Sequence, residues 1–199
     1  MSDFPSFVHL GFSHIANPEA LDHILFLLAL AAIYQGRDWR DSLWVISAFT
    51  LGHSITLALA ATGTLLIPQR LTEFLIPLTV VATGIENLLV RARAQAVSRS
   101  GYRPLFAGVF GLVHGAGFAG YLQQLFTGSV VVPLFGFNVG IELGQLVVLA
   151  AAGAGLAAFD HILLLTRLDR VRSYRLRVVT VSLVVVAVAA EMVAVRHPW

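Results

Sequence analysis

Long apolar segments with few interruptions are the feature that most restricts how this chain can fold. Stretches rich in Arg, Pro and Gly separate six such segments. A segment of about 20 apolar residues crosses a bilayer as an α-helix, because a helix satisfies its own backbone hydrogen bonds. The segments do not alternate with a period of two, which argues against a β-barrel. We therefore predict an all-α, polytopic transmembrane helix bundle with six spans, at about 20–34, 41–61, 71–90, 104–122, 133–158 and 178–195.

The composition agrees with a membrane location. Of the 199 residues, 57% are hydrophobic and 12% are charged, whereas soluble domains carry about 25% charged residues. The length fits one domain over residues 1–199, with residues 1–19 as an outer N-terminal segment. Seven spans, with an additional one in this segment, are the alternative to six, but Pro5, His9 and His14 are expected to interrupt the segment and so favour six.

The distribution of Arg predicts the orientation. All thirteen basic residues are Arg, and six spans place eleven of them on one side and only Arg70 and Arg196 on the other. Positive residues stay cytoplasmic, so both termini are expected in the periplasm and the protein in the bacterial cytoplasmic (inner) membrane. The chain has no Lys and no G-x-x-x-x-G-K-[ST] motif. This excludes transport powered directly by a nucleotide bound to this chain. The expected partners are the lipid bilayer and a metal ion, with no nucleic acid.

Ionisable residues inside the apolar segments point to a buried site, because they are costly in a membrane. His53, His114 and Glu142 lie on three different predicted spans. Each is about eight or nine residues from the outer end of its span, which is a depth of roughly 12–14 Å. The chain has no Cys, so His and carboxylate are the strong metal ligands that remain. Two imidazoles and one carboxylate suit a divalent first-row metal such as nickel, zinc or cobalt.

Further polar residues predict a path to and from this site. Asp22 and His23 lie in the first turn of a short first span, at or just inside the outer interface, and His14 precedes them. We expect these three residues to collect the ion as additional metal ligands. Glu86 lies near the cytoplasmic end of its span and is expected to act in ion exit or proton coupling. The predicted supporting or path residues are Asn138, Gln145, Thr50, Ser54, Glu86 and Asn87.

Glycines repeat at every fourth position in two of the spans. Small residues at this spacing let two helices approach closely in lipid. We expect this packing to help fix His114 against Glu142, and a remaining glycine face would allow a homo-oligomer. The predicted packing residues are Gly111, Gly115, Gly136, Gly140 and Gly144.

Five stretches that include these residues resemble the HupE/UreJ family of membrane proteins, which is linked to nickel hydrogenases and ureases. The stretches are LDHILFLL (21–28), FTLGHSITL (49–57), IEN (85–87), FGLVHGAGFA (110–119) and FNVGIELGQL (137–146). The resemblance covers roughly residues 10–150 and implies a small inner-membrane protein whose histidines bind nickel or a related metal. Nickel permeases usually carry a His-x4-Asp-His element on an early helix. Here seven residues separate His14 from Asp22.

Two functions from different classes fit these residues. The first is a divalent-metal permease, for which the resemblance implies nickel as the first choice of cargo, with zinc, cobalt or copper as alternatives. The second is an intramembrane zinc-dependent hydrolase, in which Glu142 would be either the third ligand or the base beside a metal-bound water. A metal-binding assembly or sensor subunit is a further alternative. A polar route across both faces favours the permease, whereas a lateral opening with an acyl-sized pocket favours the enzyme.

Overall fold

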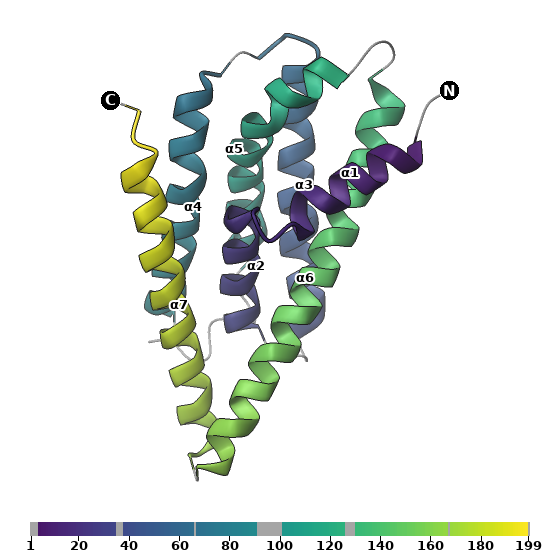
Figure 1. Ribbon diagram of the computed structural model, residues 1–199. Coiled ribbons are helices and arrows are strands. Elements are labelled where there is room, and N and C mark those ends of the chain that lie inside the picture. Colours follow the sequence, from purple (N-terminus) through teal and green to yellow (C-terminus); the bar gives the residue numbers. More distant parts are fainter. Residues whose placement is uncertain are drawn as a thin grey trace.

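The computed structural model describes residues 4–34, 38–65, 67–90, 101–125, 130–166 and 168–198, and these residues form α-helices and no strand. This confirms the prediction of an all-helical bundle. Both ends of the chain lie at the same end of the bundle, called the terminal end below (Figure 1). The helices are α1 (Phe4–Ala16), α2 (Leu21–Ile33), α3 (Trp39–Ala61), α4 (Gln69–Val90), α5 (Tyr102–Leu125), α6 (Val131–Leu165) and α7 (Arg170–Val195).

Several helices are long and apolar enough to cross a membrane. Within the described residues, α3, α4, α6 and α7 each qualify alone. The short helices α1 and α2 meet the length and hydropathy criteria only together, as a pair bent by 68°. The chain is therefore a multi-pass membrane protein with four or five helical segments that qualify by length and composition.

The helical N-terminal region is interrupted between α1 and α2, and not at Pro5, His9 and His14 as expected. Helix α1 continues through His9 and His14, and Pro5 lies in its first turn, where the missing N–H of proline costs little. The chain turns after α1, where the Asn17 side chain accepts a hydrogen bond from the Glu19 amide at 3.0 Å. Helix α2 then descends through the middle of the bundle while α1 crosses its upper part obliquely (Figure 1).

Helices α6 and α7 extend beyond the spans expected from the sequence. Helix α6 has 35 residues and continues through Gly153 and Gly155, because an isolated helix glycine costs only about 1 kcal/mol. Its length of roughly 50 Å exceeds the hydrocarbon core, and the helix runs diagonally across the bundle (Figure 1). Helix α7 begins at Arg170 because the Asp169 side chain caps it, accepting a hydrogen bond from the Arg172 amide at 2.8 Å.

Glycines hold two pairs of helices in close contact. On α5, a methyl group added at Gly111 or Gly115 would overlap the carbonyl groups of Phe49 or His53 on α3. On α6, Gly136, Gly140 and Gly144 face α1, and a Cβ at Gly144 would lie 2.9 Å from the Ile15 Cβ. The glycines therefore bring α5 to α3 and α6 to α1, instead of fixing His114 against Glu142 as the sequence analysis expected.

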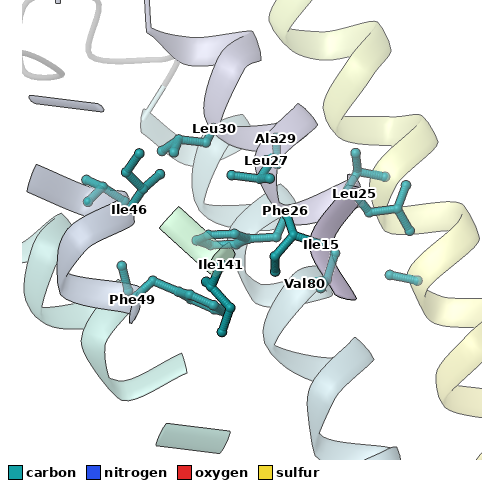
Figure 2. Close-up of a cluster of buried hydrophobic side chains, with 14 of the residues drawn as sticks. Ile15, Leu25, Phe26, Leu27, Ala29, Leu30, Ile46, Phe49, Val80 and Ile141 are labelled. Carbon is teal, nitrogen blue, oxygen red and sulfur yellow. The ribbon is translucent and has the colours of Figure 1, made fainter. Parts of the chain in front are cut away.

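The buried core surrounds α2. Nine of the 13 residues of α2 are buried, and this helix contacts α4, α6 and α7. Figure 2 shows the apolar part of this core, in which Phe26 of α2 stacks on Phe49 of α3 with ring centroids 4.9 Å apart. Because α2 is shielded by the other helices, a polar residue on it faces protein and not lipid.

Candidate metal centre

Three histidines from three helices meet in the interior of the bundle. His14 lies in the last turn of α1, His23 in the first turn of α2 and His53 within α3. Their ligand atoms all lie within 4.8 Å of one another. The side chain of His53 is fully buried and that of His23 nearly so. We call these three residues, together with the neighbouring His114, the histidine cluster.

The helix break makes this meeting possible. His14 and His23 are nine residues apart, which in one continuous helix would separate them by roughly 13 Å along the axis. The turn between α1 and α2 instead brings their ring centroids to 4.7 Å. His23, expected at or just inside the outer interface, is buried inside the bundle.

The ring nitrogens of the cluster have unused bonding capacity. Buried nitrogens without a hydrogen-bond partner occur on all four histidines, and His53 contributes both of its own. A buried polar atom left unpaired costs about 1–3 kcal/mol, so several at one place need a physical explanation. Neutral imidazole is a common ligand of zinc, copper, iron and nickel, and a metal ion would satisfy these lone pairs. The donor set therefore fits a divalent first-row metal.

His114 joins the cluster from α5, with its ring centroid 5.1 Å from that of His23. Its Nε2 lies 3.1 Å from the Thr79 hydroxyl oxygen on α4. That hydroxyl donates its one proton to the Ile76 carbonyl at 2.7 Å, so it accepts from the imidazole Nε2–H. The remaining His114 nitrogen, Nδ1, is buried without a partner. Thr79 thus sets the tautomer that leaves Nδ1 as a lone-pair donor.

Aromatic rings enclose the cluster. The His14 ring lies 4.1 Å from that of Phe118, and the His53 ring 6.3 Å from that of Phe137. Phe118 and Phe137 stack on each other at 5.1 Å. These rings exclude water from the imidazoles, so a bound cation would exchange its hydration shell for nitrogen ligands.

Glu142, predicted in the same site as His53 and His114, is not brought to the group of close ligand atoms. Its carboxylate accepts a hydrogen bond from Ser47 at 2.7 Å. Ser47 is six residues before His53 on α3, about 9 Å along the helix. Equal depth on separate spans was an insufficient guide, because the glycine contacts turn α6 toward α1.

The remaining predicted residues lie around the cluster in separate interactions. Asp22 accepts a hydrogen bond from Arg196 at 3.3 Å, which ties α2 to α7. Gln145 accepts one from Thr50 at 2.9 Å, and the Ser54 hydroxyl donates to the Thr50 carbonyl at 2.6 Å. The side-chain oxygen of Asn138, next to Phe137, is buried without a partner.

Glu86 and Asn87 lie at the end of the bundle opposite the termini. Arg103 of α5 forms an ion pair with Glu86, and Tyr102 donates a hydrogen bond to the same carboxylate. Asn87 donates to the Ala29 carbonyl of α2 at 2.7 Å. A second buried ion pair, Arg177 with Asp160, joins α7 to α6.

The sequence reasoning missed Thr79 and the two buried arginines, Arg103 and Arg177. Both arginines belonged to the loop charges used for orientation. Each follows an acidic residue of the preceding helix by 17 positions. That spacing across a helical hairpin was a usable signal for an ion pair. A threonine in an apolar helix carries no comparable signal.

The chain is a multi-pass membrane protein with a candidate metal-binding core. This core consists of buried imidazoles at the break between two short helices, inside a bundle of helices that can span a membrane. The chain belongs to the HupE/UreJ family, because the family model described as HupE / UreJ protein matches residues 1–197. Membership places it among membrane proteins of nickel or cobalt uptake or of an accessory function. Comparison with curated proteins and with solved structures gives no significant match.

Proposed function

We propose that this protein is a divalent-metal permease that carries nickel through the histidine cluster. The observation that carries the proposal is the convergence of His14, His23 and His53, with ligand atoms within 4.8 Å and buried nitrogens that have no other partner. His114 adds a fourth imidazole whose free nitrogen is set by Thr79. Family membership supports nickel as the first choice of metal.

The charge of the cluster favours transient binding. Imidazole ligands are neutral, and among the described residues no carboxylate belongs to the group of close ligand atoms. No negatively charged ligand among these residues therefore offsets the free-energy cost of taking a divalent cation out of water into the bundle interior. The C-terminal end of α1, which carries His14, offers a partial negative charge of about half an electron. Such a site holds an ion and also releases it, as transport requires.

The same arrangement weighs against a zinc hydrolase. That chemistry needs a carboxylate base beside a metal-bound water. Glu142, the expected base, instead accepts a hydrogen bond from Ser47. The permease is therefore the better-supported function.

We further propose an inner-membrane location with both termini in the periplasm. The eleven arginines predicted on the opposite side support this orientation, as does the position of both chain ends at one end of the bundle (Figure 1). In this orientation the cation enters from the terminal end, and α1 with α2 forms a single broken crossing.

Metal binding and flux test the proposal together. We expect wild-type protein, equilibrated with nickel and analysed by elemental mass spectrometry, to hold about one nickel ion per chain. The variant His23→Ala with His53→Ala should lose this ion and should not carry nickel into liposomes that contain a nickel-sensitive dye. His9→Ala is the matched control, because His9 is exposed on the same helix as His14. Equal metal content in wild type and the double variant would refute the proposal.

A further inference from the structure

A second feature of the interior lies on the opposite side of the histidine cluster from the chain termini. A cavity between α2, α3, α4 and α5 has about 40 Å³ available to the centres of water-sized molecules. One buried water needs about 10–15 Å³ on this measure, so the cavity has room for a small cation with a few waters. Its lining is mostly apolar, with Thr83, Glu86, Tyr102 and Arg103 as the polar residues, and it is partly open to the surface, where Tyr102 is 42% exposed.

A single aromatic pair separates this cavity from the cluster. Phe26 lines the cavity and stacks on Phe49 at 4.9 Å, and Figure 2 shows both rings in the core. Phe49 in turn lies 5.0 Å from the His114 ring and 6.1 Å from the His23 ring. A cation that leaves the cluster on this side therefore meets Phe49 and Phe26 first and the cavity next.

The charged groups of the cavity are paired with each other. The Arg103 guanidinium forms an ion pair with Glu86, and their side chains are 7% and 24% exposed. Arg103 also donates to the Asn87 side-chain oxygen at 3.2 Å and lies over the Tyr34 ring at 5.6 Å. Arg103 thus has two further partners, on α4 and α2, besides Glu86.

We propose that this cavity is a second cation site, in which Glu86 receives the divalent cation from the histidine cluster. Arg103 closes the site by holding the carboxylate, and the site opens when Arg103 shifts to Asn87 and Tyr34. No bond other than these ion pairs and metal contacts changes. This inference rests on the proposed permease function and assigns the step that follows binding at the cluster.

The first experiment counts bound nickel. In Arg103→Gln the carboxylate is released, and we expect a second, weaker nickel ion that disappears again when Glu86→Gln is added. Arg177→Gln is the matched control, because Arg177 also forms a buried pair, with side chains 7% and 25% exposed. No additional nickel in Arg103→Gln, or the same gain in Arg177→Gln, would overturn the proposal.

The second experiment leaves Arg103 unchanged and so does not depend on the folding of an Arg103 variant. The chain has no Cys, so Thr83→Cys introduces one thiol into the cavity wall. We expect saturating nickel to slow alkylation of this thiol by a small maleimide, and Glu86→Gln to abolish the protection. Alkylation at the same rate with and without nickel would overturn the proposal.

The two proposals fail in different ways. Absence of nickel from the wild-type cluster would defeat the permease proposal. Nickel bound at the cluster, combined with an unprotected Thr83→Cys thiol, would defeat only the second site.

Discussion

The Thr79 hydroxyl accepts a hydrogen bond from His114, and Thr79→Val removes this acceptor with little change in shape. The Nε2–H of His114, now 3.1 Å from the hydroxyl oxygen, would then be buried without a partner. Such a group costs about 1–3 kcal/mol, and without the acceptor the Nε2–H tautomer loses its advantage over the Nδ1–H tautomer. In the Nδ1–H tautomer the Nδ1 lone pair is no longer available to a metal.

The expected loss follows from the role of groups that orient metal ligands. Removing such a group lowers metal affinity by about 10–100-fold, which corresponds to roughly 1.4–2.7 kcal/mol. The measurement is a nickel titration of purified protein in competition with a chelator. Thr79→Ser keeps the hydroxyl and should retain wild-type affinity. Thr72→Val is the control, because the buried Thr72 donates only to the Gln69 carbonyl on the same helix.

A double-mutant cycle isolates the mechanism. If Thr79 acts through His114, adding Thr79→Val to His114→Ala should change nickel affinity no further. Wild-type affinity in Thr79→Val, or an equal loss in the His114→Ala background, would refute the reasoning. A purely structural role of Thr79 would lower the unfolding temperature in both backgrounds and leave the affinity coupling at zero.

Two more predictions test the surrounding architecture. Gly111→Ala places a methyl group against the Phe49 carbonyl and should sharply reduce the amount of folded protein in size-exclusion chromatography. Gly153→Ala is the control, because Gly153 has open space around it, and it should change the free energy of unfolding by no more than about 1 kcal/mol. Equal yields of the two variants would contradict the close packing of α5 on α3. Ser47→Ala removes the hydroxyl that donates to Glu142 and should lower thermal stability by about 1–3 kcal/mol without changing the nickel content, so a loss of nickel would place Glu142 in the metal site after all.

The helical architecture was predictable because it depends on local properties of the chain. Apolar segments of bilayer length form helices wherever they occur, and α3, α4 and α5 each begin and end within about three residues of the predicted spans. Helix α6 continues past the predicted span, through Asp160 to Leu165. The ion pair of Asp160 with Arg177 depends on a partner that hydropathy does not reveal.

The site was predictable in its chemistry but not in its membership. Histidines in apolar helices are costly enough to indicate a site, and His23, His53 and His114 were singled out on that ground. His14 was included because it precedes Asp22 and His23 in the N-terminal segment. Which of them meet depends on helix contacts and on the direction of each side chain. Depth along a helix fixes neither, so Glu142 was grouped with His53 although its carboxylate contacts Ser47. The break after Ala16 could not be distinguished from the start of a single short span.

The break has a thermodynamic consequence for the ion. His14 and His23 belong to two rigid rods of 13 residues each, joined by a short turn. A metal bonded to both rods favours one angle between them. By linkage, any force that favours this angle must raise the affinity for the metal by the same free energy. Metal occupancy of the histidines and the angle between α1 and α2 are therefore coupled in one equilibrium. Lipid or a partner that changes this angle would change the metal affinity without contacting an imidazole.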